Sequence, residues 1–167
     1  MKPGFAAKAR RSEGNSKRRE FKLRYGESTS SEVERIATAI VDSAYKVHTT
    51  LGPGLLESVY EACLAHELRK RGFDVKRQLL LPVIYDGIEV ADALRVDLLV
   101  DDLVVVEVKA IEKPNALFEA QIQTYLKLMR KPLGFLINFN VVLIKNGIKR
   151  ILPKTQDDVL PIDDLRL

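Results

Sequence analysis

Two charged residues interrupt an apolar stretch in the second half of this chain. Between positions 103 and 109 every residue is leucine or valine except Glu107 and Lys109. Side chains alternate between the two faces of a strand, so both charges are expected on one face, opposite three valines. Burying a charge is costly unless it is paired or binds a metal ion. The two charges therefore indicate either an ion pair on a solvent-facing strand or part of a reactive site.

A third charged residue, Asp97, lies ten positions before Glu107. If a turn at Asp101-Asp102 joins two antiparallel strands, Asp97 and Glu107 become near neighbours across them. Two neighbouring carboxylates repel each other unless a proton or a cation lies between them. A divalent ion removes that repulsion, and Mg²⁺ commonly binds one or two protein carboxylates together with waters and phosphate oxygens. Lys109 would reach the same place, where it could orient a water or balance negative charge in a transition state.

The residues available for metal binding are carboxylates rather than histidine or cysteine. Two histidines and one cysteine leave no zinc-site spacing. Carboxylate ligands favour hard ions, so Mg²⁺ or Mn²⁺ is the expected cofactor. A further carboxylate, Glu57, is expected in the first turn of a helix, at the edge of an apolar stripe that includes Tyr60. A carboxylate at this position is also explained by the helix dipole alone, and that alternative stays open.

The elements that would position these residues are a mixture of helices and strands, so the predicted fold class is α/β with α+β character. The first helix begins after Ser30 or Ser31, where Glu34 is placed to form a capping box. Gln121 and Tyr125, four residues apart, share one side of the third helix. The expected helices span about 31–48, 55–71 and 115–130, and the expected strands span 74–85, 88–100, 103–109 and 133–139.

Turn sequences predict how the strands are joined. Asp86-Gly87 is a hairpin signal, and with the turn at 101–102 it predicts a three-stranded antiparallel meander. Pro82 favours an edge strand or a bulge. Asn146-Gly147 predicts a terminal hairpin between strands at 141–145 and 148–152.

Length and composition favour one domain in a reducing compartment. The 167 residues are 46% hydrophobic, which is enough for one buried core. The longest apolar runs are cut by charges well before the roughly 18 residues that a membrane span needs. The basic N-terminus is followed by no apolar segment of the kind found in secretory signals. A single cysteine suits the cytoplasm, where we expect this protein, with no membrane partner.

The positive charge is concentrated at the N-terminus. Residues 1–27 hold nine of the 27 Lys and Arg residues and three of the 23 Asp and Glu residues, so the remaining 140 carry a balance of −2. We expect a disordered basic extension at 1–29, a folded domain at 30–152 and a short tail at 153–167. The extension is either a plain solubilising segment, an arm that contacts phosphates, or a mitochondrial transit peptide.

Three motifs in the predicted domain resemble those of a known superfamily. Asp97 followed by Glu107-Val-Lys109 resembles the D…(D/E)xK signature of the PD-(D/E)xK nuclease superfamily. The segment Gly54-Leu-Leu-Glu57-Ser-Val-Tyr60 matches the motif that names its GxxExxY family, and Gln121 to Tyr125 matches the QxxxY of its exonuclease-like members. The resemblance covers about residues 32–152. It implies a restriction-endonuclease-like core of helix, three-stranded meander, helix and strand, with a central mixed sheet flanked by helices.

The resemblance also implies a role for each matching residue. Asp97 and Glu107 would bind the metal, with Glu57 joining or supporting them. Lys109 would be the catalytic lysine, and Gln121 would help near the phosphate or the water. Gly54, Tyr60 and Tyr125 would shape the site rather than react. The chain departs from the usual pattern at Val96, just before the aspartate, and at Asn140, where the family usually has a glycine.

Two functions remain in competition on the sequence alone. The first is a metal-dependent nuclease that hydrolyses phosphodiester bonds by a Mg²⁺-activated water, with DNA favoured over RNA. The second is a catalytically idle module for nucleic-acid binding or protein assembly, and a homodimer or protein partner would suit so small a domain. Arg95 and Lys113 are the expected nucleic-acid contacts. The wider basic patch would consist of Lys76, Arg77, Arg95, Lys113, Lys127, Arg130 and Lys131.

Overall fold

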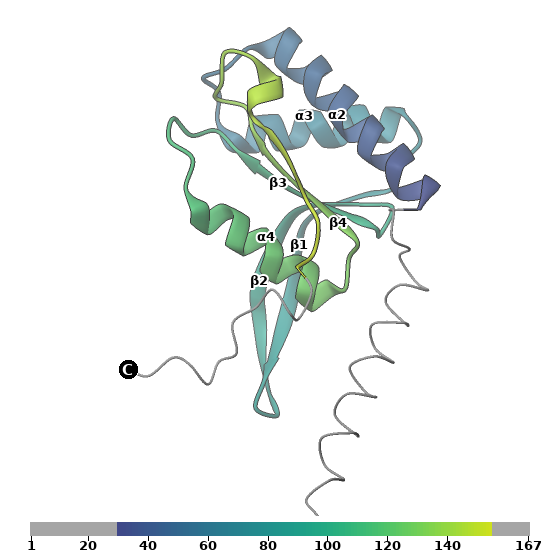
Figure 1. Cartoon of the computed structure of the whole chain (residues 1–167), viewed down its shortest axis with the longest axis vertical. Coiled ribbons are helices and arrows are strands. Elements are labelled where there is room, and N and C mark those ends of the chain that lie inside the picture. The colour runs from purple at the N-terminus through teal and green to yellow at the C-terminus, as the bar shows by residue number, and fades with distance from the viewer. Residues whose placement is uncertain (1–29, 155–167) are drawn as a thin grey trace, which may run out of the picture.

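The computed structural model describes residues 30–154, which form a sheet covered by helices on both faces (Figure 1). The helices are α2 (Ser31–Leu51), α3 (Glu57–Lys70) and α4 (Ala116–Met129), with a short 3₁₀ helix η1 (Ile144–Asn146). The strands are β1 (Val75–Tyr85), β2 (Ile88–Val100), β3 (Val104–Lys109), β4 (Leu133–Asn138) and β5 (Ile148–Ile151). The predicted extension at 1–29 and most of the predicted tail at 153–167 lie outside the described residues.

The five strands form one mixed sheet in the order β1-β2-β3-β4-β5. β1, β2 and β3 are antiparallel neighbours, which confirms the predicted meander. β4 runs parallel to β3, and α4 provides the crossover that a parallel pair requires. The predicted order of helix, meander, helix and strand is therefore confirmed, and so is the mixed sheet.

Helices lie on both faces of the sheet, so β3 is buried on both sides. Val104, Val106 and Val108 belong to the core cluster formed with α2 and α3. Val105 belongs to a second cluster, which packs against Ile122 and its neighbours on α4. Glu107 alternates with the three valines of the first cluster and so shares the α4 face with Val105. This carboxylate is held in an apolar layer instead of on a solvent-facing strand.

Two local signals act as the sequence predicts. Ser30 caps α2, because its hydroxyl accepts a hydrogen bond from Val33 N at 3.3 Å. β1 is an edge strand, and its pairing register with β2 shifts between Leu81 and Val83. Pro82 therefore lies at an edge and at an irregularity, the two places where a missing backbone donor is tolerated.

The predicted terminal hairpin between 141–145 and 148–152 is wrong. The segment before Gly147 includes η1, and β5 pairs instead with β4, where Gly134 faces Ile151. Asn138 N donates to the carbonyl of Gly147, and a Cβ at position 147 would collide with the Asn138 carbonyl oxygen. Gly147 is therefore needed for a close approach of two backbones, and the Asn-Gly pair does not form the two-residue turn that was inferred from it.

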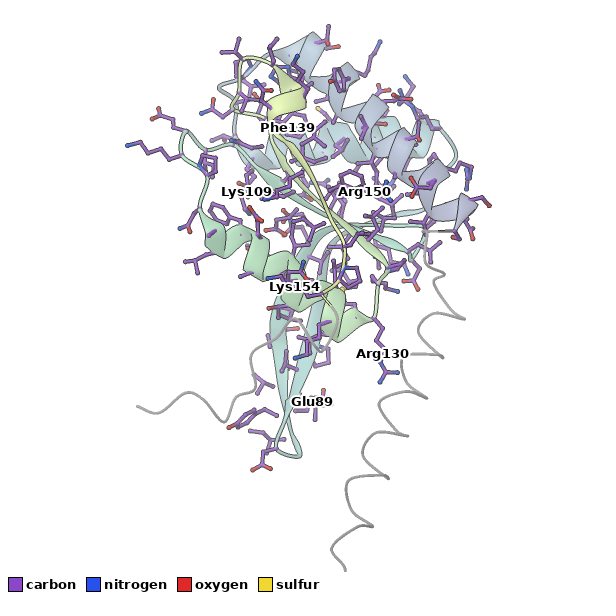
Figure 2. The ribbon with its side chains drawn as sticks, in the orientation of Figure 1. Glu89, Lys109, Arg130, Phe139, Arg150 and Lys154 are labelled. Atoms are coloured by element: carbon purple, nitrogen blue, oxygen red, sulfur yellow. The ribbon has the colours of Figure 1, made fainter. Side chains whose placement is uncertain are left out.

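The far halves of β1 and β2 project from the body as an arm (Figure 1). Glu89 lies on this arm, far from Lys109 in the body (Figure 2). The exposed apolar side chains of the arm are Leu80, Ile84, Tyr85, Ile88 and Val90. No helix in the described part of the chain is long and apolar enough to span a membrane.

Candidate active site

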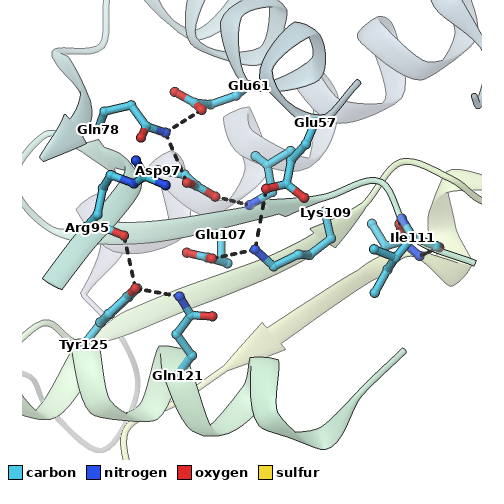
Figure 3. A network of polar contacts seen from close by, with 12 residues as sticks. Glu57, Glu61, Gln78, Arg95, Asp97, Glu107, Lys109, Ile111, Gln121 and Tyr125 are labelled. Carbon is cyan, nitrogen blue, oxygen red and sulfur yellow. Dashed lines mark hydrogen bonds and ion pairs between the residues drawn. The ribbon is translucent and has the colours of Figure 1, made fainter. Parts of the chain in front are cut away.

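Glu107 and Lys109 form a buried ion pair at the end of β3 (Figure 3). The Lys109 Nζ donates to Glu107 Oε1 at 2.7 Å and lies 3.7 Å from Glu57 Oε1 at the start of α3. The same ammonium lies 5.2 Å from the centre of the Phe118 ring, close enough for a cation–π contact. The amine of Lys109 thus joins a strand carboxylate to a helix carboxylate, and Glu57 lies at this site.

Burial shifts the protonation of both partners in this pair. Burial raises the pKa of Glu107 to about 7; the hydrogen bond from Lys109 offsets only part of this, and the charge of Asp97 adds to the rise. Burial alone would lower the pKa of Lys109, but the hydrogen bond and charge of Glu107 outweigh it and raise that pKa. Lys109 is therefore a cation at neutral pH.

One oxygen of Glu107 has no hydrogen-bond partner in the described part of the chain. Glu107 is 2% exposed, and within residues 30–154 no donor reaches its Oε2 atom. A buried carboxylate oxygen without a donor is unfavourable, and such cases in native proteins call for an explanation. A bound cation would supply what this atom lacks.

Asp97 lies beside Glu107, as the predicted strand pairing requires. The pairing of β2 with β3 ends at Leu98 and Val106, and the next residues along the two strands are Asp97 and Glu107. Asp97 Oδ2 accepts from Val108 N at 2.9 Å, and its Oδ1 accepts from Gln78 Nε2 at 3.2 Å. Asp97 is 8% exposed. Two buried carboxylates therefore meet on neighbouring strands.

The carboxylates of Asp97 and Glu107 are of the ligand type that binds a hard divalent ion. Their arrangement in this structure does not yet form a complete ligand set. Carboxylate oxygens are the ligands that Mg²⁺ and Mn²⁺ prefer, and the unpartnered Glu107 oxygen is a ready donor. No group of three His, Cys, Asp or Glu side chains among the described residues is placed to hold a metal ion. Glu57 contacts Lys109, so its predicted part in metal binding remains a prediction.

The loop before α3 is held in place by Tyr60. Its hydroxyl donates to the Gly52 carbonyl at 2.6 Å and accepts from Leu55 N at 3.0 Å. Its ring is fully buried and stacks on Phe139 with centroids 4.6 Å apart. Gly54 in the same loop has a φ of +100°, which glycine adopts without strain. These contacts fix the loop that leads into α3. The helix then begins at Glu57, which contacts Lys109.

Gln121 and Tyr125 lie together on α4, and Tyr125 links them to β2. Gln121 Nε2 donates to the Tyr125 hydroxyl at 2.6 Å, and that hydroxyl donates to the Arg95 carbonyl at 3.0 Å. Burial raises the pKa of Tyr125, so the hydroxyl stays protonated and able to donate. The pair therefore ties α4 to β2 two residues before Asp97. The predicted action of Gln121 on phosphate or water remains a prediction.

The predicted basic patch is partly neutralised by ion pairs. Arg77 Nε lies 2.9 Å from Glu61 Oε1, and Lys131 Nζ lies 3.0 Å from Asp102 Oδ2. Lys76 contacts the same Asp102 carboxylate at 3.6 Å. Arg95, on β2, and Lys113, in the loop after β3, are exposed at the surface.

Two residues near the site have contacts that were not predicted from the sequence. Gln78 on β1 donates from one amide nitrogen to both Glu61 Oε2 and Asp97 Oδ1, at 2.6 and 3.2 Å. Glu61 lies one helical turn after Glu57, a spacing that placed it on the same side of α3 without showing its partners. Nothing in the sequence marks Gln78, because its role depends on which strand residue faces Asp97.

With this geometry in view, comparison with known families gives a single clear result. The family model for the PD-(D/E)XK nuclease superfamily matches residues 34–151, so the chain belongs to this superfamily. The mixed five-stranded sheet with helices on both faces is consistent with its restriction-endonuclease-like fold. Neither a search of curated proteins nor a search of solved structures finds a match.

Proposed function

We propose that this protein is a metal-dependent nuclease that hydrolyses phosphodiester bonds in nucleic acid, with DNA preferred over RNA. Membership of a nuclease superfamily supports the reaction class. The observation that carries the proposal is the buried Glu107 oxygen that lacks a donor among the described residues, beside a second carboxylate and a cationic amine. The folded domain would comprise residues 30–152, in line with the family match to 34–151.

Asp97 and Glu107 would hold the ion, Mg²⁺ or Mn²⁺, with Glu57 joining or supporting them. When bound, such an ion lowers the pKa of a water and offsets negative charge on a phosphate. The chain would supply the rest of the chemistry. The Lys109 ammonium has three N–H donors, and carboxylates lie in two directions, so one donor is free for a phosphate oxygen or a water. Its raised pKa keeps that donor charged.

The finer assignment to the GxxExxY family rests on what its three named residues do. Gly54 supplies a left-handed turn, Tyr60 holds that loop, and Glu57 contacts the lysine. Each motif position therefore has a physical reason for its residue type. Arg95 and Lys113 are proposed to contact phosphates, and the single Cys63 supports a cytoplasmic location.

A cleavage assay with matched variants tests this function. The full-length protein would be incubated with plasmid, linear duplex, single-stranded DNA and RNA, in Mg²⁺, Mn²⁺ or EDTA. Cleavage should require the metal and should be lost in Asp97→Ala and Lys109→Ala. Lys149→Ala is the control, because Lys149 pairs with Glu119 at 2.6 Å outside the site. Wild type and Lys109→Ala behaving alike on every substrate would refute the nuclease, whereas faster cleavage of RNA would reverse only the DNA preference.

A second candidate is a catalytically idle protein that binds nucleic acid or assembles with a partner. It is favoured by the ammonium of Lys109, which already contacts two carboxylates, and by the absence of a three-ligand group within residues 30–154. The exposed apolar arm of β1 and β2 would suit a homodimer or another protein partner. This candidate predicts binding of DNA without cleavage in any metal.

A further inference from the structure

Gln78 has an unusual backbone at the level of Asp97. Arg77 pairs with Leu98 and Leu79 pairs with Val96, so Gln78 lies opposite Asp97, yet these two residues form no regular pair in the β1–β2 ladder. Gln78 has a φ of +50° in the middle of β1. Non-glycine residues rarely adopt this left-handed conformation, and strain of this kind concentrates at functional sites.

At this irregularity, the alternation of side chains between the two faces of the sheet is interrupted in both β1 and β2. Along a regular strand every second residue points the same way. On β1, however, Val75 packs against α2 and α3, whereas Leu79 packs against the α4 cluster. On β2, Leu98 belongs to the first cluster and Val96 to the second. In both strands, the residues that face α2 and α3 therefore switch to the α4 side at Gln78 and Asp97. Beyond this point the two strands leave the buried part of the sheet and form the arm.

At this crossing the Gln78 amide lies between two carboxylates (Figure 3). Its nitrogen donates to Glu61 Oε2 at 2.6 Å and to Asp97 Oδ1 at 3.2 Å. Because both neighbours are acceptors, the nitrogen must face them, which fixes the orientation of the amide. The other Asp97 oxygen accepts from Val108 N, so both oxygens of this carboxylate have fixed donors.

Glu61 in turn fixes the amide. This carboxylate is 4% exposed, and its second oxygen accepts from Arg77 Nε at 2.9 Å. Arg77 and Gln78 therefore both donate to Glu61, and the same Gln78 nitrogen donates to Asp97. A lysine at position 78 would bring a competing cation to Asp97, and an acidic residue would repel it. A neutral amide orients the carboxylate and leaves its negative charge available.

We propose that Gln78 is a positioning residue that aims the Asp97 carboxylate at a divalent ion, with Glu61 as the anchor of its amide. The inference deepens the proposed nuclease function and rests on it. Groups that orient a metal ligand through hydrogen bonds typically change metal affinity by about 10- to 100-fold when they are removed.

Gln78→Gly is the most informative variant, because glycine accepts the left-handed backbone and only the amide is lost. Gln78→Asn is the second variant, since asparagine tolerates this backbone but its amide is one carbon shorter. Gln123→Ala is the matched control: its amide also makes two hydrogen bonds, to Leu152 O and from Lys154 N, away from the site.

Mn²⁺ binding to the full-length variants would be measured by titration, beside DNA cleavage and thermal unfolding. Both Gln78 variants should bind Mn²⁺ about 10-fold more weakly or worse than wild type, while Gln123→Ala binds normally. Mn²⁺ affinity that is unchanged in Gln78→Gly, with wild-type cleavage, would overturn the positioning role and leave the nuclease intact. Wild-type protein that neither binds Mn²⁺ nor cleaves would reject both.

Discussion

Two buried carboxylates on opposite sides of Asp97 differ in how well they are hydrogen-bonded. Glu61 is 4% exposed, and each of its oxygens accepts a hydrogen bond, from Arg77 and from Gln78. Glu107 is 2% exposed, but one of its oxygens has no donor among the described residues, and burial raises its pKa to about 7. Glu61, with a donor at each oxygen, is suited to support structure, whereas the Glu107 oxygen without a donor is suited to bind a cation.

The largest expected effect is on cleavage, and it comes from substitutions at Glu107 and its partner Lys109. Glu107→Gln and Lys109→Ala should each lower the rate of DNA cleavage by about 100- to 1000-fold, because each removes a group that acts on the reacting phosphate or its metal. Glu119→Gln and Lys149→Ala are matched controls from the exposed pair on α4 and β5. If Glu119→Gln and Lys149→Ala reduced cleavage equally, the proposed difference between Glu107 and other paired carboxylates would be wrong.

Metal should stabilise the protein through the same oxygen. Mn²⁺ at about 100 times its dissociation constant should raise the free energy of unfolding of the wild type by about 2.7 kcal/mol, because only the folded state binds it. The gain should disappear in EDTA and in Glu107→Gln. Chemical denaturation with and without Mn²⁺ measures it, and an equal gain in Glu107→Gln would place the ion elsewhere.

Glu61, whose two oxygens both accept hydrogen bonds, should matter for the stability of the fold. Glu61→Ala removes a buried carboxylate, so Arg77 and Gln78 lose this acceptor. It should lower the free energy of unfolding by about 1–3 kcal/mol, a range discounted because Arg77 is 37% exposed. Urea denaturation without metal measures this loss. If Glu61→Ala unfolds like the wild type, the network is no structural support.

Tyr60→Phe tests the loop that places Glu57. The variant keeps the stacked ring and loses the hydroxyl contacts to Gly52 O and Leu55 N. We expect a loss of about 1–2 kcal/mol in stability and slower cleavage, because the start of α3 is less fixed. Tyr45→Phe, at a half-exposed tyrosine, is the control. Unchanged values in both variants would show that the loop holds its shape without this hydroxyl.

The smallest expected effect is a pH dependence at the surface. The hydrogen bond from Lys131 lowers the pKa of Asp102 from its ordinary value. A lowered pKa contributes stability above the unfolded value, and that contribution is lost as the pH falls through the folded value. Asp102 is 63% exposed, so Asp102→Asn should cost less than about 0.5 kcal/mol at pH 7. A larger cost in urea denaturation would mean that this pair is not an ordinary surface contact.

Much of the fold followed from local patterns in the sequence. The meander, the capping by Ser30 and the proximity of Asp97 to Glu107 depend on alternation and turn residues, which act over a few positions. The terminal hairpin was predicted wrongly, because Gly147 serves a contact between distant backbones that the Asn-Gly pair does not reveal.

Part of the site required the structure. The bridge from Gln78 to Asp97 depends on the left-handed backbone of Gln78 and on the exchange of faces by two strands. No local pattern predicts either feature, because both arise from packing against helices on opposite sides of the sheet. The burial of Glu107 was also not predictable from the sequence. It depends on α4, which covers the face of β3 that carries this charge.

The most direct test of this account is a titration of Mn²⁺ onto wild type, Glu107→Gln and Glu119→Gln, followed by DNA cleavage with the same three preparations. Wild type and Glu119→Gln should bind Mn²⁺ and cleave DNA in proportion to its occupancy, while Glu107→Gln should bind it weakly and cleave about 100- to 1000-fold more slowly. Binding and cleavage that are the same with Gln at position 107, or absent from the wild type, would contradict it.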